Sequence, residues 1–290
     1  MIKPVRSFFQ PGGKGLNAAR VIAAMGGEVT ALTTWGDVEG QLLLREVKYS
    51  GVHVKAVEIN RPTRTSTCLY NMTDHSFMEL LEPGVELSEE EIEALFRVFL
   101  DTIAGRPIVA LNGSSPCKAT DDFFERAAEA AKAAGCFVVV DTYGNSLVNV
   151  IRAAPHFIKM NIDEIRISFG LKITGDKELF SFAEKLQNQG MESVLITDGA
   201  RGAWLFSRGA VHRIFGNKVR GLHAIGSGDA MLGAILARME AGDPLEEACR
   251  WGAAAGAVNA GRLEICRFST KLVEDLLPSI EMKPLVQPVP

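Results

Sequence analysis

The chain has 290 residues, of which 47% are hydrophobic, and a formal net charge of −4 at pH 7. This length and composition fit one α/β domain with a substantial core. The slightly acidic balance provides no basic surface, so we expect no nucleic-acid partner. No apolar run is as long as a membrane span and no signal-peptide pattern opens the sequence, so we expect no membrane partner and a cytoplasmic location.

The cysteines favour the same location. They are few and odd in number, and none forms a Cys-x-x-Cys pair, so neither a zinc site nor a disulfide framework is indicated. We expect buried, reduced thiols, as in a cytoplasmic protein. The residues are Cys68, Cys117, Cys136, Cys249 and Cys266.

Apolar, β-branched runs alternate with amphipathic runs along the chain. The apolar runs predict strands at 29–34, 107–112, 136–141, 157–160 and 193–197, several of them apolar throughout. Apolar residues at three- and four-residue spacing predict helices at 16–25, 38–49, 89–103, 121–134, 177–189 and 229–240. Ser88 and Glu91 resemble a capping box at the start of the third of these helices. The alternation predicts an α/β fold with a mostly parallel sheet covered on both faces.

The stretch 53–81 interrupts this alternation. It contains short alternating segments at 65–72 and 76–80, with Asp74-His75 as the turn between them, and no long helix. We expect a small antiparallel flap at the edge of the main sheet, within a single domain that spans residues 1–290. Residues 283–290 include three prolines and are expected to form a loosely attached end.

A glycine-rich segment precedes the first predicted helix. Gly12, Gly13 and Gly15 let the backbone approach a ligand and direct amide groups at an anion. Lys14 adds a positive charge, and Asn17 in the first turn can reach hydroxyl groups. The segment is neither the dinucleotide fingerprint nor a P-loop. A tight turn that only starts a helix is the alternative.

A second glycine-rich segment, Gly226-Ser227-Gly228-Asp229, starts another predicted helix. Its backbone amides and the helix dipole can hold an anion that develops during a reaction. Asp229 lies within the same turn and can accept a proton from an attacking hydroxyl. On spacing alone, Asp229 could equally be a helix cap.

Two further segments carry polar groups after predicted strands. Asn161 and Glu164, at i and i+3, can point the same way from a first helical turn and suit a hydrated magnesium ion, although an N-cap with a first-turn acid fits equally well. The 197–202 segment follows a strand and contains Gly199 and Gly202. It can hold a nucleotide phosphate or form a plain hairpin turn.

In chain order, these segments resemble the signatures of the ribokinase-like, or PfkB, carbohydrate kinases. The 12–20 and 226–229 stretches resemble the two main signatures, and 197–202 resembles a Ser/Thr-Leu-Gly-x-x-Gly turn with aspartate in place of leucine. Lys159, Asn161 and Glu164 match Lys-Pro-Asn-x-x-Glu, with methionine in place of proline. The 112–116 stretch resembles Gly-Ser-Leu-Pro-Pro, with two substitutions. The resemblance covers the chain from about Gly12 to Arg267.

Finer features resemble the hexose-phosphate branch, which includes 1-phosphofructokinase and tagatose-6-phosphate kinase. The run Gly-Gly-Lys-Gly-Leu-Asn-Ala-Ala-Arg is similar to the version in that branch, and so are the 82–88 stretch and the serine at 227. Arg64 matches an arginine that the branch uses on the substrate phosphate. A solvent-exposed charge on the flap is the alternative for Arg64.

The resemblance implies a ribokinase-like three-layer αβα sandwich with a β flap as a lid, which transfers a phosphoryl group from ATP, with Mg²⁺. By position it makes Asp229 the base, and Gly226, Ser227 and Gly228 the anion hole. It directs Gly12, Gly13, Lys14, Asn17, Arg64 and Ser114 to the sugar phosphate, Lys159, Thr197, Gly199, Gly202 and Asn259 to the nucleotide, and Asn161 and Glu164 to Mg²⁺.

One departure from the family pattern concerns the start of the chain. Relatives begin with a strand that carries an Asn-Pro-x-x-Asp motif, whose aspartate holds sugar hydroxyls. We therefore expect the central sheet to lack its first strand and to expose an apolar edge. A misassigned start, a truncated fragment and a true loss are all open. If the chain is complete, sugar binding and stability should be weakened.

The preferred interpretation is phosphorylation of fructose 1-phosphate to fructose 1,6-bisphosphate. Tagatose 6-phosphate, fructose 6-phosphate, or an unphosphorylated sugar or nucleoside are alternatives, although Lys14 and Arg64 favour a phosphorylated substrate. A non-catalytic sugar- or nucleotide-binding regulator is the alternative from another class, and Asp229 argues against it. A homodimer that pairs through the flap is a further expectation from the family.

Overall fold

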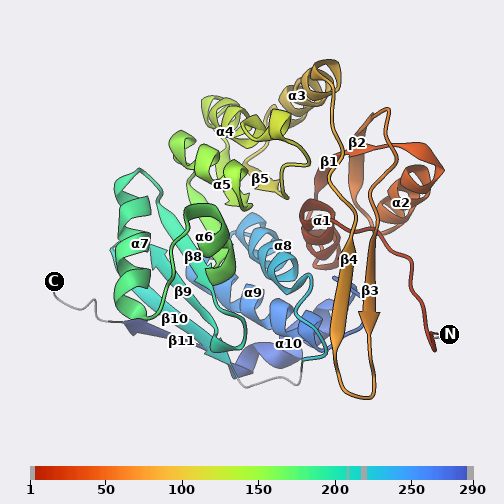
Figure 1. Cartoon of the computed structure of the whole chain (residues 1–290). Coiled ribbons are helices and arrows are strands. Elements are labelled where there is room, and N and C mark those ends of the chain that lie inside the picture. Colours follow the sequence, from red (N-terminus) through yellow and green to blue (C-terminus); the bar gives the residue numbers. More distant parts are fainter. Residues whose placement is uncertain (1–3, 208, 217–220, 286–290) are drawn as a thin grey trace.

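The computed structural model describes residues 4–207, 209–216 and 221–285 (Figure 1). Its strands are β1 (Thr30–Trp35), β2 (His53–Glu58), β3 (Ser66–Tyr70), β4 (Phe77–Leu81), β5 (Ile108–Asn112), β6 (Phe137–Asp141), β7 (Phe157–Asn161), β8 (Ser193–Thr197), β9 (Ala203–Ser207), β10 (Ala210–Gly216) and β11 (Ile280–Leu285). Its α-helices are α1 (Lys14–Ala24), α2 (Asp37–Tyr49), α3 (Glu89–Ile103), α4 (Phe123–Ala133), α5 (Asn145–Val150), α6 (Ile162–Phe169), α7 (Asp176–Asn188), α8 (Ser227–Glu240), α9 (Leu245–Ala260) and α10 (Thr270–Leu276).

The main sheet has seven strands in the order β11-β10-β9-β8-β7-β6-β5. Strands β5 to β8 are parallel, as expected for apolar strands separated by helices, and β9 to β11 continue the sheet in antiparallel pairs. Each predicted strand and each predicted helix is confirmed, within about two residues at its ends. The capping box that Ser88 and Glu91 were expected to form is present at the start of α3.

Helices cover both faces of this sheet (Figure 1). Because neighbouring side chains of a strand point to opposite faces, Val138 and Val140 pack under helices α3 to α7, whereas Val139 packs against α1, α8, α9 and α10. All three valines are fully buried. The arrangement is the expected three-layer αβα sandwich.

The β1 and β2 strands form a separate parallel pair. Within the described residues no strand lies between β1 and β5, and the residues of both strands line one cleft of about 2750 Å³. This division of the sheet agrees with the expectation that one strand of the central sheet is lacking. Leu32 and Val109 are among the residues that line this cleft, but both also pack into the core, and only 8% of Val109 is exposed.

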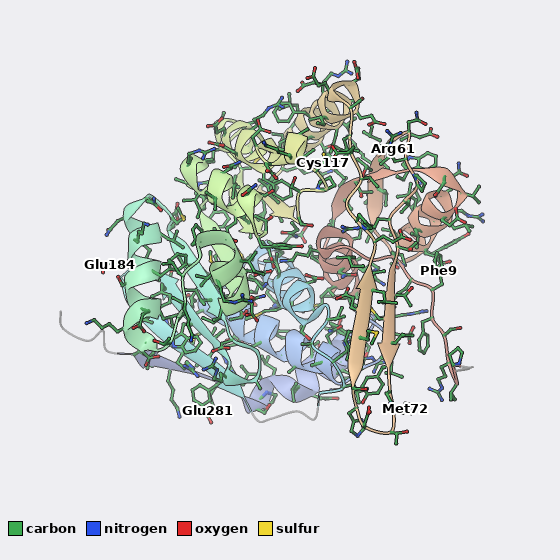
Figure 2. The ribbon with its side chains drawn as sticks, in the orientation of Figure 1. Phe9, Arg61, Met72, Cys117, Glu184 and Glu281 are labelled. Carbon is green, nitrogen blue, oxygen red and sulfur yellow. The ribbon has the colours of Figure 1, made fainter. Side chains whose placement is uncertain are left out.

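The flap is smaller than predicted. The stretch at 53–58 was expected to belong to it, but these residues form β2 and pair with β1, because a local alternating pattern does not reveal which strand is the partner. Only the antiparallel hairpin of β3 and β4 forms the flap, and Met72 lies near its tip (Figure 2). Cys68 on β3 is exposed, in contrast to the burial expected for the thiols.

The chain end also differs in part from its prediction. Residues 283–285 were expected to be loosely attached, but they belong to β11 and pair with β10. Residues 286–290 lie outside the described part of the chain. Among the described helices, none combines the length and the apolar character that a membrane span requires.

Candidate active site

The first glycine segment leads directly into α1. Gly13 has a φ of 94°, in the left-handed region that favours glycine, and turns the chain into the helix. A Cβ added at Gly12 or Gly13 would have no heavy atom within 4 Å, so the backbone here is open on the side of the cleft. The structure therefore leaves space for a ligand against this turn.

The second glycine segment starts α8 in a similar way. Gly226 has a φ of 71° and precedes the helix, and Ser227 and Gly228 form its first turn. No described side chain caps this end of α8; the Ser227 amide donates to the Ala224 carbonyl over 3.1 Å, and the Gly228 amide after it can face an anion. Asp229 lies in the same turn with only 8% of its surface exposed, and it lines the cleft.

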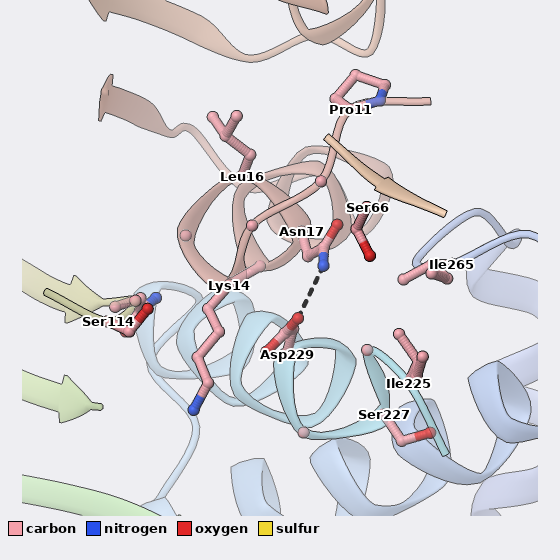
Figure 3. Close-up of a pocket in the computed structure, with 18 of the residues that line it drawn as sticks. Pro11, Lys14, Leu16, Asn17, Ser66, Ser114, Ile225, Ser227, Asp229 and Ile265 are labelled. Carbon is pink, nitrogen blue, oxygen red and sulfur yellow. Dashed lines mark hydrogen bonds between the residues drawn. The ribbon is translucent and has the colours of Figure 1, made fainter. Parts of the chain in front are cut away.

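Asp229 is connected to α1 by a buried hydrogen bond (Figure 3). The side-chain nitrogen Nδ2 of Asn17 donates to Oδ2 of Asp229 over 2.8 Å. Burial and the nearby Asp141 carboxylate raise the pKa of Asp229 to about 6, although the hydrogen bond from Asn17 acts in the opposite direction. Asp229 is thus an acid that ionises close to neutral pH, which suits a general base.

A chain of four alternating charges lies beside Asp229. Lys159 donates to Asp141 over 2.5 Å, Lys14 donates to the other oxygen of Asp141 over 2.7 Å, and Lys14 also donates to Glu164 over 2.5 Å. Burial acts to raise the pKa of Asp141, but the two ammonium groups outweigh it and hold that pKa below its usual value. Burial also disfavours the Lys14 cation, but Asp141 and Glu164 together raise the pKa of Lys14.

Asp141 was not among the residues predicted from the sequence. This residue ends β6, and its side chain meets Lys159 in the middle of β7, because the parallel register that pairs Val140 with Ile158 brings the next residues of the two strands together. An acid that directly follows a buried apolar strand is a signal that could have identified it. Only 1% of Asp141 is exposed.

Lys159 also lies close to the α8 turn. A Cβ added at Gly228 would be 3.1 Å from the Lys159 ammonium nitrogen, so glycine at this position allows the approach. Only 3% of Lys159 is exposed. A positive charge therefore lies beside the amides that were predicted to hold an anion.

Asn161 and Glu164 form a capping box at the start of α6. The side chain of each residue accepts a hydrogen bond from the backbone amide of the other, both over 2.8 Å. The N-cap alternative is therefore realised. Within the described residues, no group of three or more His, Cys, Asp or Glu residues could hold a metal ion. The Asn161 oxygen and both Glu164 oxygens already accept hydrogen bonds, so these residues fit Mg²⁺ only as outer partners of an ion that keeps several waters and is held mainly by nucleotide phosphates.

The 197–202 segment forms a tight turn between β8 and β9. Asp198 donates its amide to the Gly202 carbonyl over 2.8 Å. Gly202 has a φ of 92°, and an added Cβ would clash with the carbonyl of Ile214, so only glycine fits. Thr197, Gly199 and Gly202 all line the cleft.

Asn259 does not lie where the sequence predicted. It is fully buried, and its amide nitrogen donates to the Ile225 carbonyl over 2.8 Å and to the Ser227 hydroxyl over 3.1 Å. Its oxygen accepts the backbone amide of Cys266 over 2.7 Å. Both polar atoms of the Asn259 side chain are thus hydrogen-bonded inside the protein. The direct nucleotide contact that was expected of Asn259 is therefore not available. Asn259 instead supports the turn before α8.

The other residues predicted to bind the substrate lie around the same cleft. Arg64 is exposed just before β3, and Ser114 is half-buried just after β5. Figure 3 places Ser114 and Asp229 on opposite sides of the Lys14 side chain. The cleft therefore brings together residues from both glycine segments, the 197–202 turn and the approach to the flap.

The comparisons with known proteins agree with this geometry. The pfkB family carbohydrate kinase model matches residues 4–269. The chain is 30% identical over 274 residues to the 1-phosphofructokinase of Bacillus subtilis (strain 168), covering 94% of this chain and 88% of that protein. It is 29% identical to the ATP-dependent 6-phosphofructokinase isozyme 2 of Mycobacterium tuberculosis (strain ATCC 25618 / H37Rv), covering 86% of this chain and 74% of that protein.

A solved structure gives the same result. The tetrameric inhibited form of phosphofructokinase-2 from Escherichia coli superimposes with a TM-score of 0.85 at 25% identity, covering 96% of this chain and 92% of that one. The fold, the family match and the sequence relatives therefore lead to one assignment: the chain belongs to the pfkB family of carbohydrate kinases.

Proposed function

We propose that this chain transfers the γ-phosphoryl group of ATP to the free primary hydroxyl of fructose 1-phosphate, giving fructose 1,6-bisphosphate and ADP. The observation that carries the proposal is Asp229, a buried acid with a pKa of about 6 that lies in the cleft at the start of α8. The name of the Bacillus subtilis relative supports fructose 1-phosphate as the acceptor.

In the proposed reaction, Asp229 accepts the proton of the attacking hydroxyl. The oxygen of that hydroxyl forms a bond to the γ-phosphorus as the bond to the β-phosphate oxygen breaks, and ADP leaves. The turn of Gly226, Ser227 and Gly228, with the nearby Lys159 ammonium, stabilises the charge on the transferring group, and the Ser227 amide, which donates to the Ala224 carbonyl over 3.1 Å, would have to turn from that carbonyl to take part. Asn17 keeps Asp229 oriented through its 2.8 Å hydrogen bond.

We assign the remaining positions by the cleft that they line. The sugar phosphate lies against Gly12, Gly13, Lys14, Asn17, Arg64 and Ser114, and the nucleotide lies against Thr197, Gly199, Gly202 and Lys159. Asn161 and Glu164 would hold the Mg²⁺ that accompanies ATP, through water, and the ion would offset the phosphate charge. The whole chain acts as one kinase domain with the hairpin of β3 and β4 as its flap, in the cytoplasm.

The flap also supports a proposal about assembly. Leu69, Met78, Leu80 and Leu81 on β3 and β4 are each more than half exposed, which is unusual for large apolar side chains on one hairpin. We propose that two copies of the chain pair through this hairpin. The tetrameric structure of the Escherichia coli relative is consistent with self-association.

A substrate panel tests the catalytic proposal. ADP release from ATP would be measured with fructose 1-phosphate, fructose 6-phosphate, tagatose 6-phosphate, fructose and ribose. We expect the highest kcat/KM with fructose 1-phosphate. Preferential use of fructose 6-phosphate, which the name of the Mycobacterium tuberculosis relative makes the second candidate, would correct the acceptor but keep the reaction. No turnover with any of the five would refute the proposed function.

A further inference from the structure

Arg20 is a buried arginine on α1 to which the proposed mechanism gives no task. Only 6% of its surface is exposed. One terminal nitrogen of its guanidinium donates to the side-chain oxygen of Asn17 over 2.8 Å and to the carbonyl of Ile265 over 3.1 Å. Its Nε atom is buried without a hydrogen-bond partner among the described residues. A buried cation is expensive unless its contacts have a function.

The chemistry of the guanidinium determines which way the Asn17 amide points. A guanidinium has only donors, so it must face the oxygen of Asn17. The amino group of Asn17 then faces Oδ2 of Asp229, to which it donates over 2.8 Å. If the amide were reversed, two donors would meet at Arg20 and two acceptors would meet at an ionised Asp229.

We propose that Arg20 is a positioning residue, which fixes the orientation of the Asn17 amide so that Asp229 receives a donor and is held as the ionised base. Arg20 touches neither substrate nor reacting atoms and acts through Asn17. This inference rests on the proposed role of Asp229. The hydrogen bonds of Asn17 to its two partners are both buried, where a polar group left without a partner is costly.

Other charged and titratable groups face this relay from several elements. Around Asp229 these are Asp141 on β6, Lys159 on β7 and Lys14 on α1; around Arg20 they are Cys266, Arg267 and Glu264, which follow α9. Burial raises the pKa of the Cys266 thiol, so this group is neutral at pH 7. Arg267 is a second cation near Arg20, but it pairs with Glu264 and no contact joins it to Asn17 among the described residues.

The test replaces Arg20 and follows the ionisation of Asp229. With Arg20→Met, the Asn17 amide can reverse and accept a hydrogen bond from a protonated Asp229, which favours the acid form. We expect the pKa of Asp229, read from its side-chain carboxyl ¹³C shift in ligand-free protein, to rise by about one unit. The midpoint of the acid limb in the pH profile of kcat should rise by the same amount. Arg20→Met should therefore have a much lower kcat than the wild type at pH 6 and a similar kcat at pH 8.5.

Matched variants separate this role from a structural one. Arg20→Lys keeps a donor for Asn17 and should restore most of the wild-type profile. Arg267→Met removes a neighbouring cation that does not contact Asn17, and it should leave the pKa of Asp229 unchanged. If Arg20 had a purely structural role, Arg20→Met would lower kcat by the same factor at every pH and leave the acid limb unchanged. That result would overturn the proposal.

Two further outcomes also bear on the proposal. If Arg20→Met does not fold, Arg20→Leu replaces it, because leucine also offers no donor to the Asn17 oxygen; an unshifted pKa in that variant overturns the proposal. If the wild-type protein phosphorylates no sugar phosphate, the proposed function fails, but the ¹³C titration of ligand-free protein still reports whether Arg20 controls Asp229.

Discussion

Asn17 on α1 donates to Asp229 on α8 over 2.8 Å, and both side chains are buried. This bond joins the two helices that begin with glycine turns and line the cleft. The proposed base is therefore not an isolated acid at a helix end. Its position depends on how closely α1 and α8 pack, and its ionisation depends on the charges around it.

The pH dependence of the reaction should report Asp229. Burial and Asp141 raise the pKa of this acid to about 6, and the base form is the ionised one. Because the reaction needs ionised Asp229, activity is lost as the pH falls through this pKa. We expect the acid limb of the kcat/KM profile for fructose 1-phosphate to have its midpoint near pH 6. A midpoint near 4, where an ordinary aspartate ionises, would show that the environment does not tune this residue.

Gly233 should control the spacing between α1 and α8. A Cβ added at this position would lie 2.6 Å from the Ala18 carbonyl oxygen and 2.8 Å from Cβ of Val21, so the helices would have to separate. We expect Gly233→Ala to lower the free energy of unfolding by about 1–3 kcal/mol and to lower kcat, because the bond from Asn17 to Asp229 would lengthen. Urea unfolding and steady-state kinetics measure the two effects.

Gly175→Ala is the control for Gly233→Ala. Gly175 precedes α7, and an added Cβ would meet nothing closer than 3.6 Å, at the flexible end of Glu178. This variant should keep the wild-type kcat. An unchanged kcat in Gly233→Ala as well would mean that the packing of α1 on α8 does not matter to the site.

Asp141 should be important for stability as well as for charge. Asp141→Asn would leave Lys159 buried without its carboxylate partner, and breaking a buried pair in this way costs about 3–5 kcal/mol of unfolding free energy. Because the pKa of Asp141 is lowered, its contribution is complete above the ordinary pKa of an aspartate and is lost as the pH falls below it. Denaturant unfolding at pH 7 measures the loss.

Asp163→Asn provides the comparison for Asp141→Asn. Asp163 pairs with Arg166 on the surface, where the two side chains are 79% and 59% exposed. Exposed pairs contribute about 0–1 kcal/mol, so this variant should unfold almost as the wild type does. Equal losses in the two variants would contradict the structural importance of the buried cluster.

The sequence predicted most of the regular elements because their patterns are local. The strand at 193–197 has the predicted bounds, since its apolar residues are buried on both faces. Helix α9 was not predicted. It is rich in alanine and glycine and packs within the core, so its sequence shows little contrast between an apolar and a polar face.

The site was predicted less completely than the fold. The glycine turns and Asp229 have recognisable local patterns, and the structure brings them to one cleft. The contacts of Asp141 and Asn259 depend on which strands and loops become neighbours in space, and no local pattern contains that information. The same reason explains the error at β2, whose partner is β1 and not the flap.

Arg64 should affect substrate affinity more than turnover. It is exposed beside the cleft, and a charged hydrogen bond to a phosphate is worth about 1.5–3 kcal/mol. We expect Arg64→Ala to raise KM for fructose 1-phosphate by about tenfold or more, with KM for ATP unchanged. Arg61→Ala is the control, because Arg61 is also exposed and donates to the Asn60 carbonyl. The same KM for fructose 1-phosphate in Arg64→Ala and Arg61→Ala would show that Arg64 does not contact the substrate phosphate.

The most direct test of the account is the turnover of Asp229→Asn with fructose 1-phosphate and ATP. The amide keeps the size of the side chain but cannot accept the proton, so kcat should fall by about 10²–10⁴-fold. Calorimetry should show ATP binding close to that of the wild type, because the predicted nucleotide contacts lie elsewhere in the cleft. A kcat within a few-fold of the wild type, in a variant that binds ATP normally, would contradict the assignment of Asp229 as the base.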